Sequence, residues 1–354
     1  MHVISWWRTQ FGEPETKRVA DAIAREHISQ GPVTAEFEAR LAEALGVPHV
    51  VAASSGSAAM LMALLALDIR PGDEVIVPNR TWIATAHAAA MAGAKVVLVD
   101  VLPHLPILDV SQVRSKITAR TKAIMPVHLG GRLVDMKALS AIAQEYGLRV
   151  IEDAAQALFS GNAGVRSDAG CFSLSVAKLI STGQGGFVAT KSKETAERLK
   201  LVRTHGVADV IHCTYTRLGF NFRLTDIQAS IGLAQLDRAP GRMERMKALY
   251  SRYETGLAGL PFVKLIPVDM RAGELPLYVE VLCDDREKVM EHLRLRGIQS
   301  RPFYPDLNRA GYLGGDGEFP NARVFGERGL FLPCGPDQPP ENVDRVLEAL
   351  RAFQ

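Results

Sequence analysis

One lysine of the sequence stands between an apolar segment and a glycine-rich turn. Lys178 follows Val176-Ala177 and precedes the turn at 183–186, which reads Gly-Gln-Gly-Gly. Burial in apolar surroundings lowers the pKa of a lysine, and the neutral amine so formed can attack a carbonyl carbon. An isolated lysine more often lies at the surface with its stem along apolar residues. Lys178 is therefore a candidate for Schiff-base chemistry only if other residues support it.

A small-residue segment earlier in the chain can hold a phosphate group. Ser55-Gly56-Ser57 follows an apolar run at 50–53 and opens a predicted helix at 57–67. Small residues let the backbone approach an anion, hydroxyl groups add donors, and a helix N-terminus presents free N–H groups. A serine that simply caps a helix is the alternative interpretation.

Two more side chains follow predicted strands. Asp153 ends the apolar segment at 150–151, and its carboxylate can keep a ring nitrogen protonated because opposite charge favours the charged form. Trp82 follows a predicted strand at 75–77 and offers a flat surface for stacking. Taken alone, a capping or ion-paired aspartate and a core tryptophan are the more common situations.

The elements that position these residues alternate between short apolar runs and helical patterns. Strands are expected at 50–53, 75–77, 96–99, 123–127 and 150–151, with helices at 36–45, 57–67 and 135–146. This alternation predicts an α/β fold with a mostly parallel sheet covered on both faces. Ligands of such sheets bind beyond the carboxyl ends of the strands, which is where Ser57, Trp82 and Asp153 are placed.

The pattern changes after about residue 240. A long helix is expected at 242–258, a strand at 277–282, a helix at 284–295 with Asp284 as N-cap and Glu287 three residues on, and an amphipathic helix at 341–353. We predict a large domain at 1–240 and a smaller α+β domain at 241–354, with residues 1–30 as a segment that can pack on the small domain.

Composition excludes several classes of protein. The formal net charge is +2, so no charge-driven nucleic-acid or membrane surface is expected. The N-terminus has no signal-peptide pattern, and the longest apolar run, 58–67, is about half of a membrane span. The 4 cysteines are scattered without a CxxC pair, so we expect no disulfide framework, no metal site and a cytoplasmic protein.

The order of the candidate residues is more informative than any one of them. A phosphate segment, an aromatic residue, an aspartate, a serine and a lysine follow one another along the chain. Together they supply a partner for each part of pyridoxal 5'-phosphate (PLP). The sequence therefore predicts a PLP site.

Over nearly its whole length the sequence resembles the DegT/DnrJ/EryC1/StrS aminotransferases, the sugar aminotransferases of antibiotic and surface-polysaccharide pathways. The resemblance implies the aspartate-aminotransferase fold (fold type I). The matching segments are 31–38, 55–59, 71–78, 81–85, 126–129, 152–156, the lysine segment at 171–188, 205–206, 219–223, 228–232, 319–322 and 332–333.

The resemblance assigns roles around the cofactor ring. It implies that Lys178 forms the Schiff base and moves the proton between substrate and cofactor carbons. Asp153 would pair with the pyridinium nitrogen, Gln156 would contact the ring hydroxyl, and Trp82 occupies the aromatic stacking position of the family.

The resemblance also assigns the phosphate contacts. Gly56, Ser57 and Ser173 would bind the phosphate of the cofactor. Asn221 would reach the cofactor phosphate of the neighbouring subunit, which implies a homodimer with shared active sites.

Three positions depart from the family pattern. Ser57 stands where a threonine is usual and keeps the hydroxyl group. Gln184 replaces the glutamate of the glycine-rich turn and removes a charge near the lysine. Asn308 stands near the place of a usual histidine, which bears on substrate recognition by that loop.

By resemblance, the protein is expected to take an amino group from glutamate or glutamine, which forms pyridoxamine phosphate. It is then expected to pass the amino group to a nucleotide-linked keto-sugar or to a cyclitol ketone. One alternative is a PLP- or pyridoxamine-phosphate-dependent dehydratase of the same family, in which a histidine replaces the lysine; Lys178 argues against it. A regulatory paralogue without catalysis is the other alternative, and the presence of both Asp153 and Lys178 argues against that one.

Overall fold

The computed structural model describes residues 3–209, 211–212, 214–314 and 317–353. Its larger sheet has seven strands in the order β1-β7-β6-β5-β4-β2-β3, and β7 alone runs antiparallel to its neighbours. The α/β class with a mostly parallel sheet is confirmed. The strands are β1 (His49–Ala53), β2 (Glu74–Pro78), β3 (Lys95–Val99), β4 (Thr121–Ile124), β5 (Arg149–Asp153), β6 (Ala169–Ser173) and β7 (Gly186–Thr190).

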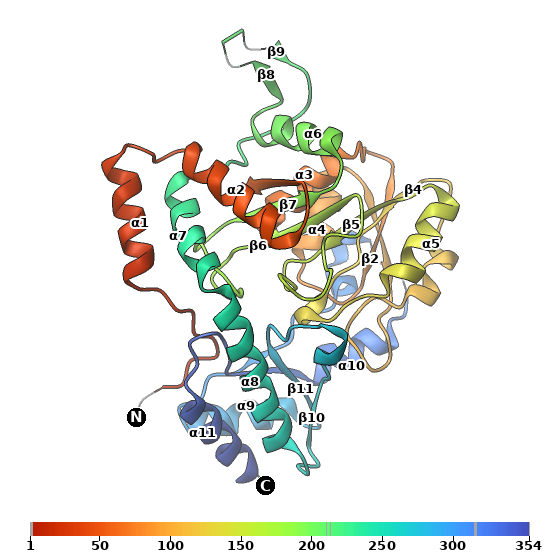
Figure 1. Ribbon diagram of the computed structural model, residues 1–354. Coiled ribbons are helices and arrows are strands. Elements are labelled where there is room, and N and C mark those ends of the chain that lie inside the picture. The colour runs from red at the N-terminus through yellow and green to blue at the C-terminus, as the bar shows by residue number, and fades with distance from the viewer. Residues whose placement is uncertain (1–2, 210, 213, 315–316, 354) are drawn as a thin grey trace.

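Helices cover both faces of this sheet, as Figure 1 shows. Alternate residues of β1 belong to different cores: Val51 and Ala53 pack with α3 (Gly56–Ala66), α4 (Ala84–Met91) and α6 (Lys193–Arg203). Val50 and Ala52 pack with α2 (Pro32–Leu45) and α7 (Asp226–Asp237) on the opposite face, which α5 (Met136–Tyr146) also covers. Burial on both sides explains why the centres of these strands are mostly apolar.

The second sheet has four antiparallel strands in the order β10-β11-β13-β12. These are β10 (Val263–Leu265), β11 (Val279–Cys283), β13 (Gly329–Leu332) and β12 (Arg301–Pro302), and the helices of this part are α8 (Ala239–Leu257), α9 (Arg286–Leu295), α10 (Pro320–Arg328) and α11 (Pro340–Arg351). The long α8 connects it to the larger sheet (Figure 1). The domain division at residue 240 stays a prediction.

The N-terminal segment contacts both parts of the chain. Ile4 bridges Ile298 and Trp7 bridges Cys334, so this end of the chain lies along the second sheet. The following helix, α1 (Glu13–Ala24), packs on α7 instead.

One predicted helix start was wrong by one residue. The helix expected from Asp284 begins at Arg286, and its N-cap is Asp285, whose carboxylate accepts a hydrogen bond from Lys288 N at 3.1 Å. Asp284 instead donates its backbone N–H to Phe262 O and pairs with Arg328. No helix in the described ranges is both long and apolar enough to cross a membrane.

Candidate active site

A cavity of about 680 Å³ lies at the carboxyl ends of the strands of the large sheet. Residues from both sheets line it: the second sheet contributes Phe331 and Arg301, and Tyr278 lies directly before β11. All predicted site residues except Asn221 line this cavity, namely Gly56, Ser57, Trp82, Asp153, Gln156, Ser173 and Lys178.

The predicted phosphate corner is the N-terminus of α3. Ser55 is its N-cap: its Oγ accepts from Ala58 N at 3.0 Å, and its carbonyl accepts from Ala59 N at 3.0 Å. The N–H groups of Gly56 and Ser57 donate to none of the described residues, so they remain for an anion. A Cβ at Gly56 would lie 2.9 Å from Ser173 Cβ, so only glycine lets α3 approach the end of β6.

Asp153 is held as a fixed acceptor at the end of β5. Its Oδ2 accepts from the Thr85 hydroxyl at 2.6 Å and its Oδ1 accepts from Ala155 N at 3.0 Å. The carboxyl group is buried, and burial raises its pKa, while both donors and the nearby Lys178 act in the opposite direction. A cationic ring nitrogen beside it would favour the carboxylate, so the residue fits its predicted partner.

Lys178 has the lowered pKa that the sequence predicts. Burial lowers the pKa of its amine to about 8, against the opposing charge of Asp153. The loop that carries it is fixed by two aromatic residues. Tyr278 Oη donates to Ala177 O at 2.9 Å, and Trp7 Nε1 donates to Val176 O at 3.1 Å.

Trp82 and Gln156 lie on the same cavity but in different settings. Trp82 is 53% exposed, and its ring makes a T-shaped contact with the ring of Tyr304, with 4.9 Å between ring centres. Gln156 is buried, and its Oε1 accepts from Gly130 N at 2.9 Å. The Trp82 ring is therefore accessible for stacking on a ligand, whereas the Gln156 amide is held in place by the backbone N–H of Gly130.

The structure describes all three residues that depart from the family pattern. Ser57 and Gln184 line the cavity, and the Gln184 carbonyl accepts from Gln228 Nε2 at 2.7 Å. Asn308 forms reciprocal contacts with Asn79: Asn79 Nδ2 donates to its Oδ1 at 3.2 Å, and its backbone N donates to Asn79 Oδ1 at 2.8 Å. Asn308 therefore ties its loop to the segment that leads to Trp82.

Asn221 lies outside this cavity. It is exposed, and its Oδ1 accepts from Arg223 Nε at 3.0 Å. Its predicted contact with the cofactor phosphate of another subunit stays a prediction.

Sequence reasoning missed several residues that line or support the site. Thr85 could have been found, because it lies three residues after Trp82, in the first turn of α4. Trp6, Tyr278 and Arg301 gave no such signal, because only the fold brings them to the lysine. Arg301 places its guanidinium 4.1 Å from the centre of the Trp6 ring.

Comparison with known proteins gives a consistent result. The model of the DegT/DnrJ/EryC1/StrS aminotransferase family matches residues 9–351. GDP-perosamine synthase of Caulobacter vibrioides is 36% identical, over 91% of this chain and 90% of its own. The dTDP-3-amino-3,4,6-trideoxy-alpha-D-glucose transaminase of Streptomyces venezuelae is 37% identical, over 91% of this chain and 87% of its own. The aminotransferase TlmJ from Streptoalloteichus hindustanus superposes with a TM-score of 0.94 at 30% identity, over 99% of this chain and 98% of its own.

Proposed function

The chain belongs to the DegT/DnrJ/EryC1/StrS aminotransferase family, whose cofactor is PLP, and from that premise we propose that it transfers an amino group to a nucleotide-linked keto-sugar. The names of the two relatives above, a GDP-sugar synthase and a dTDP-sugar transaminase, support this acceptor class. The observation that carries the proposal is the meeting of Lys178, Asp153 and the free N-terminus of α3 on one cavity.

The residues present fit PLP. We assign the phosphate to Gly56, Ser57 and Ser173. Asp153 would hold the ring nitrogen, and Trp82 would cover a ring face. When bound, PLP withdraws electrons from the bonds at the carbon that carries the amino group.

Lys178 is proposed as the residue that moves the proton. Its pKa of about 8 means that neutral and protonated forms both exist near neutral pH. The same amine can then take a proton as a base and return it as an acid, which is where general acid–base catalysis is most efficient. Glutamate or glutamine is the proposed amino donor.

We propose that two copies of the chain share their active sites. The hairpin of β8 (Val207–Asp209) and β9 (Thr214–Tyr215) projects beyond α6 in Figure 1. Tyr215, Leu218 and Phe220 are 66–75% exposed beside Asn221, an apolar surface that a second copy would cover.

A mixed-subunit experiment tests the shared sites. Asn221→Ala and Lys178→Ala chains, each inactive alone, should regain activity when co-expressed, because one site of the mixed dimer would carry both native residues. A mixture as inactive as its parts would contradict the assignment of Asn221.

The first test of the function itself is the visible spectrum of the purified protein. We expect absorbance from bound PLP that shifts to the pyridoxamine form when L-glutamate is added, and that is lost in Lys178→Ala. Matched samples with L-glutamine identify the donor. A protein that binds no PLP would refute the proposal, and a band that neither donor moves would refute the donor class.

A reducing, cytoplasmic location also stays a proposal. It is supported by the buried, unpaired thiols of Cys171, Cys283 and Cys334, the cysteines that the structure describes.

A further inference from the structure

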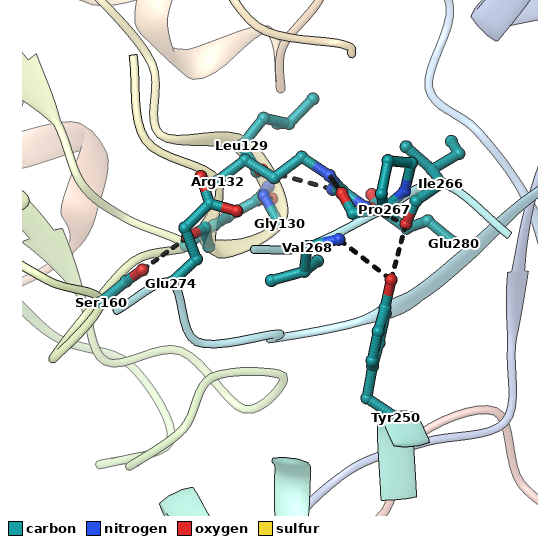
Figure 2. Close-up of polar contacts among 12 residues, drawn as sticks. Leu129, Gly130, Arg132, Ser160, Tyr250, Ile266, Pro267, Val268, Glu274 and Glu280 are labelled. Carbon is teal, nitrogen blue, oxygen red and sulfur yellow. Dashed lines mark hydrogen bonds and ion pairs between the residues drawn. The ribbon is translucent and has the colours of Figure 1, made fainter. Parts of the chain in front are cut away.

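A fully buried ion pair joins the loop after β4 to the second sheet, as Figure 2 shows. Arg132 is 0% exposed, and its Nη1 meets the carboxylate of Glu280, which lies on β11 and is 1% exposed. Its Nε donates to Pro267 O at 2.8 Å and its Nη2 donates to Ile266 O at 3.0 Å. The guanidinium therefore binds β11 and the segment that follows β10 at once.

The neighbouring groups of this pair are also fixed. Tyr250 Oη donates to Ile266 O at 3.0 Å and accepts from Val268 N at 3.0 Å (Figure 2). Leu133 N donates to the Glu274 carboxylate at 2.8 Å. These hydrogen bonds restrict the geometry of the pair, because a shift of the guanidinium would leave buried polar groups unpaired.

The network ends at a residue of the catalytic cavity. Arg132 Nη1 lies 3.5 Å from Leu129 O, in the turn whose next residue is Gly130. Gly130 accepts from Leu277 N at 3.2 Å and donates its own N–H to Gln156 Oε1 at 2.9 Å. With φ of +64°, a Cβ at Gly130 would lie 2.5 Å from Arg132 Nη1 and from the Glu280 carboxylate. The turn is thus packed directly against the ion pair.

This contact fixes the orientation of the Gln156 amide. A backbone N–H can only donate, so the atom that it meets must be the amide oxygen. The NH₂ group is then the end left for the cavity, and it donates to none of the described residues. A ligand atom at this place must be a hydrogen-bond acceptor.

We propose that Arg132 and Glu280 are positioning residues that hold the Leu129–Gly131 turn, so that Gln156 presents its NH₂ group as a donor to an anionic oxygen on the cofactor ring. The inference deepens the proposed function and rests on it for the identity of the ligand. The orientation of Gln156 itself rests only on the contacts above.

The first measurement needs no cofactor. Amide hydrogen exchange over residues 128–134 is compared in the cofactor-free wild type, Arg132→Lys and Glu280→Gln. The control is Arg203→Lys, which disturbs a partly buried ion pair elsewhere in the molecule. Arg203 meets Glu38 there at 2.6 Å, and the pair makes no contact with the turn. We expect faster exchange at Gly130 in the first two variants and wild-type exchange in the control. Unchanged exchange at Gly130 would overturn the inference, whatever the protein catalyses.

The second measurement is the pH midpoint of the absorbance change of bound PLP. Gln156→Glu replaces the donor by an acceptor, so we expect the midpoint to rise by about one to two pH units, the effect of one hydrogen bond to a charged group. Arg132→Lys and Glu280→Gln should raise the midpoint less. The titratable and charged groups that line the same cavity are unchanged in all three variants, namely Asp153, Lys178, Tyr278, Arg301 and Tyr304.

The outcomes separate the two proposals. If Gln156→Glu moves the midpoint but Arg132→Lys and Glu280→Gln behave as the Arg203→Lys control, the pair is only structural and the inference is wrong. If the wild type binds no PLP, the proposed function fails, and the exchange data still decide whether the pair holds the turn.

Discussion

Removing the Arg132 side chain should destabilise the protein strongly. Arg132→Met keeps similar length but leaves the Glu280 carboxylate, 1% exposed, without its partner. The carbonyl groups of Pro267 and Ile266 lose a donor as well, although Ile266 O keeps that of Tyr250. Breaking a buried pair on one side costs about 3–5 kcal/mol of unfolding free energy, because the remaining charge is uncompensated.

The corresponding change in melting temperature follows from chain length. Unfolding entropy is about 2.1 cal/mol/K per residue, or roughly 0.74 kcal/mol/K for the 354 residues. A loss of 3–5 kcal/mol then lowers Tm by about 4–7 °C.

Thermal unfolding of the cofactor-free protein, followed by circular dichroism, measures this change. The matched variant is the double substitution Arg132→Met with Glu280→Leu, which removes both charges. It should recover much of the loss, since apolar replacement of a whole buried pair is often neutral or stabilising. A Tm within about 1 °C of the wild type for Arg132→Met alone would refute the reasoning, because the pair would then carry no uncompensated charge.

Three further predictions concern the cavity. Gly56→Ala places a Cβ 2.9 Å from Ser173 Cβ, so it should weaken PLP binding by about tenfold or more, measured by fluorescence titration; unchanged affinity would remove this corner from the phosphate site. The pKa of Lys178 is about 8 in the folded protein against an ordinary 10.5. Between these two pH values the unfolded chain binds a proton at Lys178 that the folded chain does not bind. The free energy of unfolding of the cofactor-free protein should therefore rise with pH from about 8 to 10.5. Denaturant unfolding across that range should show a smaller rise in Lys178→Met, and equal slopes would contradict the lowered pKa. Thr85→Val removes the donor 2.6 Å from Asp153 and should raise the pKa of that carboxyl further, lowering the transamination rate about tenfold in a single-turnover assay; a wild-type rate would show that Thr85 does not support Asp153.

The strands were predictable from the local pattern of apolar residues. The apolar pair at 150–151 was predicted as a strand, and it lies buried within β5, which ends at Asp153. Where two equal residues compete, the pattern fails. Asp284 and Asp285 are both suitable N-cap residues. In the structure Asp284 forms an ion pair with Arg328 of α10, and Asp285 is the N-cap.

The sequence by itself predicted the order of the chemistry: a phosphate segment after β1, an aromatic surface after β2, an aspartate at the end of β5 and a lysine after β6. It could do so because each of these side chains is placed by its own strand or helix start, within a few residues. Only the tertiary structure decided what surrounds them. Three contacts join segments up to about 150 residues apart: Thr85 with Asp153, Tyr278 with the loop that carries Lys178, and Arg132 with Glu280 next to the turn that holds Gln156. No local spacing encodes such contacts, since they exist only once two sheets pack together and leave a shared cavity between them.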